Sequence, residues 1–262
     1  MNIEFSSRLL ERLRTAEGVV AFTGAGVSAE SGVPTFRGNE GIWGKFKPEE
    51  LASMDAFMKN PELVWQWYAH RKKIIASIEP NPGHRALARM ERYFSSFSVV
   101  TQNIDNLHAR AGSSRVYELH GNIERNYCMK CGTPMSNSDA LAQTGVPTCT
   151  RATQSDEACG GLIRPDVVWF GEMIPEDQWH ASVRAIESAD MFLSIGTSGV
   201  VYPAASLPML ARQHGAFIVE INPEATPLTQ EADEFLKGQS GVVLPALCDR
   251  IAALRSTPTS SH

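Results

Sequence analysis

The 262-residue sequence has no excess of positive charge, no long apolar run and no internal repeat. Its 24 Lys and Arg residues against 29 Asp and Glu residues give a net charge of −5, which argues against a nucleic-acid-binding surface. The longest apolar stretches have only the length of a strand, so we expect no membrane-spanning segment. We also find no signal peptide, and we therefore expect a soluble, cytoplasmic protein.

The composition is that of an ordinary globular protein, with 43% hydrophobic and 20% charged residues. A chain of this length can form one large domain, or one large and one small domain. Residues 1–18 place apolar side chains at helical spacing, which predicts an amphipathic first helix. Cys248 lies on a predicted final helix, where we expect a small core residue. Residues 256–262 are small and polar, and we expect this tail to be disordered.

A glycine-rich turn follows the first apolar segment of the chain. Val19–Phe22 predicts a buried parallel strand, and residues 24–29 (GAGVSA) then show the G-x-G-x-x-A pattern of a phosphate-binding turn. The first glycine permits the tight turn, and the second lets the backbone approach a pyrophosphate. A helix that starts there offers free N–H groups to the anion, so the pattern predicts a dinucleotide site.

The segment after this turn differs from that of an ordinary dehydrogenase. A dehydrogenase has a full helix, a second strand and then an acidic residue for the ribose, about 20 residues further on. Here Gly32 and Pro34 are expected to end the helix after about two turns, and residues 36–41 (FRGNEG) predict a mobile loop. We therefore predict a bound dinucleotide without routine hydride transfer, with an NAD-dependent dehydrogenase as the nearest enzymatic alternative.

The cysteines indicate a metal site. Cys128 and Cys131 form a C-x-x-C pair in a Gly- and Pro-rich setting, which is typical of a zinc knuckle. Cys149 follows near the usual spacing of a zinc ribbon, whereas Cys159 is delayed by an insertion at 150–158. A redox-active pair or unrelated thiols are the alternatives. We favour one structural zinc held by all four cysteines, because such a closed site supports folding and leaves no position for a catalytic water.

Polar residues cluster where two further predicted strands end. Residues 102–108 (QNIDNLH) follow an apolar strand, and the carboxyl end of a parallel strand is where open α/β sheets bind their ligand. A helix N-cap is the alternative, and it accounts for Asp105 or Asn106 but not for all of the polar residues. His120, beside Gly121 at the end of another short strand, is a candidate general base, although a lone His is more often a surface or core residue.

Two later segments complete the predicted sheet. Residues 191–195 run into Gly196-Thr197-Ser198, and residues 216–221 run into Asn222-Pro223. These small polar groups suit contacts with ribose and adenine, and simple turn formation explains each of them equally well.

Taken in this order, the motifs closely resemble those of the sirtuins, the NAD-dependent protein lysine deacylases. The matching segments are GAGVS at 24–28, Phe36-Arg37, QNID at 102–105, LHGN at 119–122, the four cysteines, VWFGE at 168–172, GTS at 196–198 and Asn222. They cover nearly the whole chain, and their combination is far more specific than any one of them.

The resemblance implies an α/β fold with two domains. The larger is a Rossmann-like NAD-binding domain, a parallel sheet with helices on both faces, built from residues 1–40, 83–121 and 166–255. The smaller is made of a helical insertion, 41–82, and a zinc ribbon, 122–165. NAD and an acyl-lysine peptide would meet in the cleft between the two domains.

The resemblance also implies roles for single residues. His120 is expected to act as the general base that takes a proton from the ribose of NAD. Asn103 and Asp105 are expected to line the nicotinamide and ribose region, where a carboxylate stabilises the positive charge that develops as nicotinamide leaves. The acyl oxygen attacks the ribose carbon, and the acyl group ends on ADP-ribose. Phe36 is expected to cover the reacting centre and exclude water.

The implied binding residues form two further sets. The cofactor set is Gly24, Ala25, Gly26, Ser28, Ala29, Glu30, Thr35, Phe36, Arg37, Trp43, Gln102, Asn103, Ile104, Asp105, Gly196, Thr197, Ser198, Asn222, Pro223, Glu224 and Ser240. The substrate set is Val168, Trp169, Phe170 and Gly171, expected to pair with the substrate backbone, together with Tyr68 and Arg71.

One departure from the commonest sirtuin pattern bears on the acyl group. Many members have Asp where this chain has Thr35, and the Thr form resembles the class III subgroup that removes succinyl and malonyl groups. That subgroup carries a Tyr-x-x-Arg pair in the helical insertion, and Tyr68 and Arg71 stand here at that spacing. A guanidinium binds a carboxylate through two hydrogen bonds, and a phenol adds a donor. The alternative is that Arg71, with Lys72 and Lys73, forms a solvated basic face while Tyr68 packs in the core.

We therefore expect acylated-lysine proteins or peptides as substrates, NAD as the co-substrate and one structural Zn²⁺. We expect no nucleic-acid or membrane partner, and a monomer. Acetyl removal as the main activity, and protein ADP-ribosyl transfer from the same NAD site, remain alternatives. A non-catalytic NAD or ADP-ribose sensor is disfavoured, because it would need neither His120 nor the pair of Asn103 and Asp105.

Overall fold

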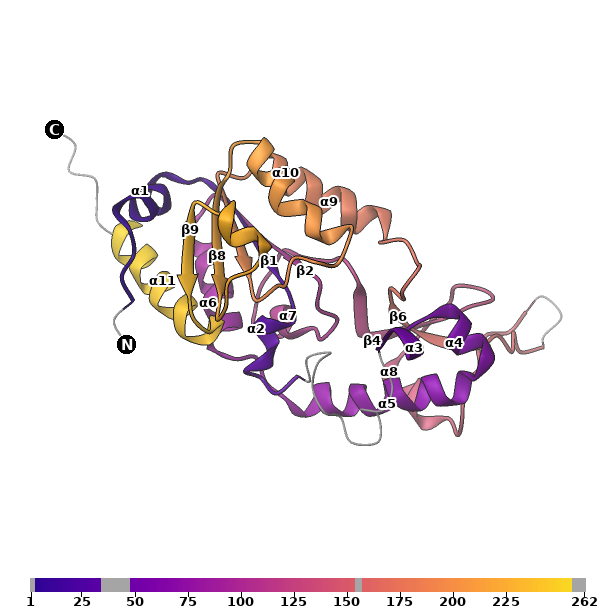
Figure 1. Cartoon of the computed structure of the whole chain (residues 1–262). Coiled ribbons are helices and arrows are strands. Elements are labelled where there is room, and N and C mark those ends of the chain that lie inside the picture. The colour runs from indigo at the N-terminus through magenta and orange to yellow at the C-terminus, as the bar shows by residue number, and fades with distance from the viewer. Residues whose placement is uncertain (1–2, 34–47, 154–156, 256–262) are drawn as a thin grey trace.

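The computed structural model describes residues 3–33, 48–153 and 157–255 (Figure 1). Its main feature is a six-stranded parallel sheet with the strand order β3-β2-β1-β7-β8-β9, which confirms the predicted α/β fold. The strands are β1 (Gly18–Thr23), β2 (Ser96–Thr101), β3 (Val116–Glu118), β7 (Met191–Ile195), β8 (Phe217–Asn222) and β9 (Glu234–Lys237). The strand order reverses at β1, and a ligand in an open α/β sheet binds beside the carboxyl ends of the strands at such a reversal.

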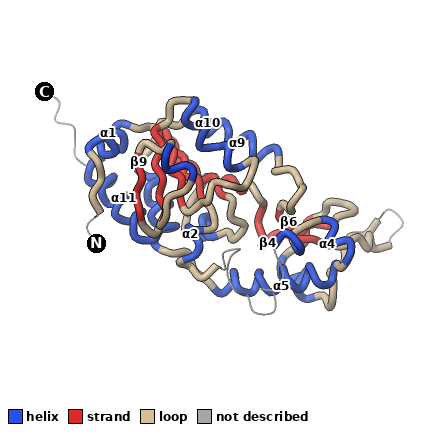
Figure 2. Tube along the Cα trace, viewed as in Figure 1, coloured by secondary structure: helices blue, strands red, loops and turns tan. Residues whose placement is uncertain are grey.

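Helices cover both faces of this sheet (Figure 2). On one face lie α1 (Ser7–Thr15), α6 (Pro82–Met90) and α11 (Ser240–Arg255), which share a core with Val19 and Ala21 of β1. On the other face lie α9 (Glu176–Glu187) and α10 (Leu207–Gln213), which pack on Val20 and Phe22. Successive residues of a strand point to opposite faces, so the continuous apolar run of β1 serves both cores. The predicted first helix and the core position of Cys248 are confirmed.

A smaller antiparallel sheet lies to one side of the main sheet, in the strand order β5-β4-β6 (Figure 1). Its strands are β4 (Gly121–Cys128), β5 (Pro134–Met135) and β6 (Ile163–Val167), with α8 (Asn137–Ala142) beside them. Three helices pack against it, namely α3 (Pro48–Leu51), α4 (Met54–Lys59) and α5 (Pro61–Ser77). Phe57, Trp67 and Tyr68 from these helices form one core with Ile123 and Trp169. The two segments expected as insertions therefore share one hydrophobic core, to which Val167 and Trp169, expected in the larger domain, also contribute.

The shorter connecting elements are α2 (Gly26–Ala29), α7 (Leu107–Arg110), and the 3₁₀ helices at Glu91–Tyr93, Ala204–Ser206 and Pro227–Gln230. Helix α2 has only four residues, so the prediction of about two turns was too long. Residues 30–32 after α2 form turns. Gly32 has a φ of +87°, which no residue of a right-handed helix adopts, so the helix does not continue. Within the described residues, none of the helices is both long enough and apolar enough to cross a membrane.

Candidate active site and metal centre

The glycine-rich turn lies against the carboxyl end of β7. The N–H of Gly24 donates to the carbonyl of Ile195 over 3.0 Å, and that of Gly26 donates to Gly196 over 2.8 Å. A Cβ atom on Gly26 would lie 2.7 Å from Gly196 Cα, and one on Gly24 would lie 2.8 Å from Thr197 Cβ. The sequence interpretation related the second glycine to a pyrophosphate. The structure adds a reason within the chain, because neither backbone approach leaves room for a side chain.

Asn103 and Asp105 follow β2 and meet this turn. The Asn103 amide donates to the carbonyl of Gly24 over 3.0 Å and to the hydroxyl of Ser28 over 3.1 Å. Asp105 is buried, and its carboxylate accepts the N–H of Leu107 over 3.0 Å. Burial raises the pKa of Asp105, while the bonds from Leu107 and Ser28 partly oppose that rise. The N-cap position of α7 is Asn106, whose side chain makes no capping bond, so the N-cap alternative explains neither the bond of Asp105 to Leu107 nor the contacts of Asn103.

Behind Ser28 lies a buried pair of histidines that the sequence interpretation did not include among the site residues. His84 Nε2 lies 3.3 Å from the Ser28 hydroxyl, and His108 Nε2 lies 2.9 Å from the hydroxyl of Thr23. The two rings pack with centroids 4.8 Å apart. Burial lowers the pKa of His84 to about 4 and that of His108 well below its usual range, so both are neutral at pH 7. Asn81 in the Asn-Pro-Gly-His segment before His84 is a visible N-cap signal for α6, but nothing in that signal indicates the partner of His84.

His120 stands two residues after the end of β3. Its Nδ1 lies 3.0 Å from the carbonyl oxygen of Gln102. Because a carbonyl only accepts, Nδ1 carries the hydrogen in this contact, and Nε2 keeps its lone pair. Burial lowers the pKa of His120, and the bond to Gln102 partly offsets this effect. Gly121 follows with a φ of +78°, and a Cβ there would lie 2.2 Å from the carbonyl oxygen of Asp166. The turn that presents a neutral, accepting His120 thus requires this glycine.

The remaining predicted cofactor residues lie at the carboxyl ends of β2, β7 and β8, around helix α2 after β1, and at the start of α11. The Gln102 amide donates to Thr197 Oγ1 over 3.0 Å, and the Asn222 amide donates to the Thr197 carbonyl over 2.8 Å. The Glu30 carboxylate accepts from the Ser240 hydroxyl over 3.1 Å and from the Gly241 N–H over 2.8 Å, so it caps α11. Half-buried positions are held by Ala25, Ile104 and Gly196, and exposed ones by Ala29, Ser198, Pro223 and Glu224. Thr35, Phe36, Arg37 and Trp43 lie outside the described residues.

The segment at residues 168–171 connects His120 to the smaller part of the molecule. The Val168 N–H donates to the carbonyl of His120, and the Phe170 N–H donates to that of Ala52, each over 2.9 Å. Trp169 is buried, whereas the Phe170 side chain is 50% exposed. Gly171 follows with a φ of +88°. The structure therefore fixes this segment from both sides, close to the histidine.

Tyr68 and Arg71 lie on one face of α5, and both are buried, at 1% and 5% exposure. The phenol oxygen of Tyr68 accepts the indole N–H of Trp169 over 2.8 Å, and the guanidinium carbon of Arg71 lies 5.1 Å from the ring centroid of Trp67. Burial raises the pKa of Tyr68 far above its usual range. The solvated-face alternative is wrong for Arg71 and also for Lys72, which is buried and donates to the carbonyl of Ile123. The expectation that Tyr68 packs in the core is correct.

The four predicted zinc ligands come together at one end of the small sheet. Their sulfur atoms all lie within 4.8 Å of one another. The Cys128–Cys159 and Cys131–Cys149 sulfur pairs are 3.8 and 3.7 Å apart. These distances far exceed a disulfide bond, and they match the edge of about 3.8 Å expected for a tetrahedron with zinc–sulfur bonds of about 2.3 Å. The insertion at 150–158 therefore does not prevent Cys159 from joining, because its ends fold back so that the Gly160 N–H donates to the Cys149 carbonyl over 3.0 Å.

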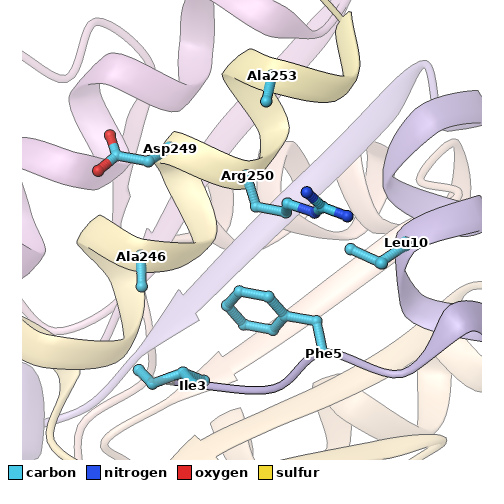
Figure 3. A pocket seen from close by; sticks show the side chains of 7 residues that line it. All are labelled: Ile3, Phe5, Leu10, Ala246, Asp249, Arg250 and Ala253. Atoms are coloured by element: carbon cyan, nitrogen blue, oxygen red, sulfur yellow. The ribbon is translucent and has the colours of Figure 1, made fainter. Parts of the chain in front are cut away.

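A separate hollow of about 470 Å³ lies between the N-terminal segment and the second half of α11 (Figure 3). Its lining residues are Ile3, Phe5, Leu10, Ala246, Asp249, Arg250 and Ala253. None of the predicted site residues lines it, so the candidate active site is the carboxyl edge of the main sheet.

Comparison with known sequences agrees with this geometry. The model of the Sir2 family matches residues 24–203, well over half of the chain. An NAD-dependent protein deacylase of Aquifex aeolicus is 48% identical over 231 residues, which are 88% of this chain and 94% of that protein. An NAD-dependent protein deacylase of Mycobacterium tuberculosis is 46% identical over 237 residues, which are 90% of this chain and 98% of that protein.

Solved structures agree as well. The crystal structure of a Sir2 homologue in complex with NAD is 44% identical and gives a TM-score of 0.89, with 97% of this chain and 96% of that chain covered. A variant of a Sir2 homologue bound to ADP-ribose is 43% identical and gives a TM-score of 0.89 over 98% and 100% of the two chains. NAD and ADP-ribose are the ligands of these Sir2 homologues, and the four cysteines of this chain cluster as the ligands of a structural zinc do. On the match to the family model and to these relatives, the chain belongs to the Sir2 family.

Proposed function

We propose that this protein is an NAD-dependent protein-lysine deacylase that removes succinyl and malonyl groups, and acetyl groups as well. The products would be nicotinamide, free lysine and O-acyl-ADP-ribose. The curated relatives, which are named NAD-dependent protein deacylases, support the deacylase activity. A Sir2 structure with a deacetylated peptide and 3'-O-acetyl ADP-ribose, 33% identical and covering 94% of this chain, supports a peptide substrate.

The preference for acidic acyl groups is carried by one observation, the burial of Tyr68 and Arg71 on the same face of α5. A guanidinium and a phenol at this spacing match a carboxylate, because the first offers a bidentate charged donor and the second a further O–H. An acetyl group offers no carboxylate to either side chain. Succinyl- and malonyl-lysine are therefore the substrates that use the pair most fully.

The other site residues fit a deacylase that uses NAD. NAD would supply the ribose carbon that the acyl oxygen attacks as nicotinamide leaves; with one water consumed, the acyl group would end on the ribose and the lysine amine would be released. His120 Nε2, held with its lone pair available, would take the proton from the ribose hydroxyl. Asn103 would be held in place by its bonds to Gly24 and Ser28, beside the buried carboxyl group of Asp105. Phe36, outside the described residues, would exclude water from the reaction.

A mass-spectrometric assay with matched succinyl-, malonyl- and acetyl-lysine peptides tests the proposal, with and without NAD. We expect NAD-dependent loss of succinyl and malonyl faster than loss of acetyl. Arg71→Met should reduce desuccinylation by roughly ten- to a hundredfold, as expected for losing a charged hydrogen-bonding partner, and change deacetylation by much less.

Lys73→Met is the matched control for this substitution. It removes one positive charge from the same helix at an exposed position two residues away, and both rates should stay near those of the unmodified protein. Equal losses on both substrates in Arg71→Met would return that residue to a purely structural role. Acetyl loss alone in the unmodified protein would leave a deacetylase, and ADP-ribose attached to protein would indicate an ADP-ribosyltransferase.

A further inference from the structure

One buried hydrogen bond joins Trp169 to Tyr68. The indole Nε1–H of Trp169 donates to the phenol oxygen of Tyr68 over 2.8 Å, and each side chain is 1% exposed. The two residues are 101 positions apart in the sequence, with Tyr68 on α5 and Trp169 in the segment after β6. This bond therefore couples the residue pair proposed to bind the acyl group to the segment proposed to bind the substrate backbone.

The bond also has a direction. An indole N–H can only donate, so the Tyr68 oxygen is the acceptor and its own hydrogen is left for a second partner. Among the groups that the structure describes, none accepts this hydrogen. A buried donor without an acceptor costs free energy, and the carboxylate of a ligand is a strong acceptor. Because burial raises the pKa of Tyr68, the hydroxyl keeps its hydrogen throughout the neutral range.

The indole ring of Trp169 is itself held on several sides. The guanidinium carbon of Arg164 lies 3.5 Å from its ring centroid, and the Phe57 ring lies 5.3 Å away on centroids. Arg164 is paired with Glu172 over 2.6 Å, and Glu172 in turn accepts the backbone N–H of Trp169 over 2.8 Å. These contacts hold the backbone and the ring of Trp169 in the orientation in which its indole N–H donates to Tyr68.

We propose that Trp169 is a positioning residue for acidic acyl groups, and that its indole N–H holds the Tyr68 hydroxyl as a donor toward the acyl carboxylate beside Arg71. This inference rests on the proposed succinyl and malonyl preference. An acetyl group makes no use of the Tyr68 donor, so the indole N–H favours one substrate class over the other through a second residue.

The test measures kcat and KM with succinyl- and acetyl-lysine peptides for Trp169→Phe, Tyr68→Phe and the double variant. Trp169→Phe removes the N–H and should raise KM for the succinyl peptide about three- to tenfold, in line with the loss of one hydrogen bond. Any effect of the substitution on the substrate-binding segment is shared by both peptides, so the ratio of the succinyl KM to the acetyl KM isolates the loss of that bond and should rise about three- to tenfold. In the Tyr68→Phe background, Trp169→Phe should add no further loss on the succinyl peptide, because Trp169 acts only through the phenol.

A matched control is Trp65→Phe, which removes a buried indole from the same helix as Tyr68. It should leave the ratio of succinyl to acetyl rates unchanged. If Trp169→Phe unfolds the protein, as its thermal transition would show, the sulfur analogue of tryptophan, benzothienylalanine, replaces it at position 169. That analogue keeps the bicyclic shape and lacks only the N–H, so the same rise in succinyl KM is expected.

Two failures would be distinguishable. If the unmodified protein removes succinyl faster than acetyl, but Trp169→Phe lowers both rates equally or adds fully to Tyr68→Phe, the positioning role of Trp169 is overturned and the proposed function stands. If the unmodified protein shows no succinyl preference and Arg71→Met affects both substrates alike, the proposed specificity fails, and the role of Trp169 fails with it.

Discussion

The two sides of the candidate site are built in different ways. At the carboxyl edge of the main sheet, short polar side chains such as Ser28, Asn103 and Thr197 bond to each other and to nearby backbone. On the smaller side, long side chains of Tyr68 and Arg71 are buried among aromatic rings. The first arrangement suits NAD, which every deacylation uses. The second suits the acyl group, which differs between substrates.

This difference predicts which substitutions should affect all acyl substrates and which should affect only some of them. Changes at the sheet edge should affect all acyl substrates alike, because every substrate needs NAD and the general base. Changes around Tyr68 should discriminate among acyl groups, because only a carboxylate uses the buried donors. Substitutions on the two sides therefore test whether cofactor chemistry and acyl recognition are separable in this molecule.

The largest effect is expected at His120. His120→Ala removes the proposed base, and kcat/KM should fall by roughly 10²- to 10⁴-fold for succinyl and acetyl peptides alike. The fold should remain intact, since the side chain is only partly buried and its one described hydrogen bond goes to the Gln102 carbonyl. Steady-state kinetics and a thermal melt measure the two properties.

His180→Ala supplies the control for that experiment. His180 is exposed on α9, so its removal should change neither rate nor stability. Substantial turnover in His120→Ala would remove His120 from the role of base. A loss confined to one acyl group would contradict the separation between the two sides of the site.

The zinc cluster should produce the next largest effect. Cys159→Ala leaves three sulfur ligands, so bound zinc should fall from about one ion per chain toward none, and the small sheet should lose much of its stability. Deacylation of every acyl group should fall at least about tenfold, because the small core that holds Tyr68 and Trp169 includes residues next to the cluster. Metal analysis, a thermal melt and the peptide assay measure these changes.

Cys248→Ala is the matched control, because it removes a buried cysteine from the main core and not from the cluster. It should keep its zinc and cost only about 1 kcal/mol of stability. Retention of a full zinc ion and an unchanged transition in Cys159→Ala would show that Cys159 is not a ligand.

The main sheet was predictable from sequence because its information is local. Each of its signals spans only a few consecutive residues: the apolar run of β1, the glycine turn after β1 and the polar residues after β2. The ends of these strands can therefore be located from the sequence. The length of α2 was overestimated because the prediction ended the helix near Gly32 and Pro34, whereas α2 ends at Ala29. The cysteine cluster was predictable from its first pair, although only the positions of the four sulfur atoms show that Cys159 reaches the others.

The contacts that sharpen the site were not predictable in the same way. His84 meets Ser28 from 56 positions away, and Trp169 meets Tyr68 from 101 positions away. Each of these side chains has an ordinary local pattern, a position near a helix start or an apolar position in a core. Long-range pairing of this kind leaves no periodic signal in the sequence. The spacing therefore predicts that Arg71 lies beside Tyr68, but it does not predict the contact between Trp169 and Tyr68.

The smallest expected effect is a shift of the pH profile. Burial lowers the pKa of His120, so its neutral form persists below the ordinary histidine value of about 6.5. The acidic limb of kcat/KM should therefore lie below pH 6.5, with activity lost as pH falls through the lowered pKa and the base becomes protonated. The same limb should appear for acetyl and succinyl peptides, because both depend on one base. An acidic limb that differs between the two peptides would mean that a group near Tyr68 and Arg71 titrates. Cofactor chemistry and acyl recognition would then not be separable.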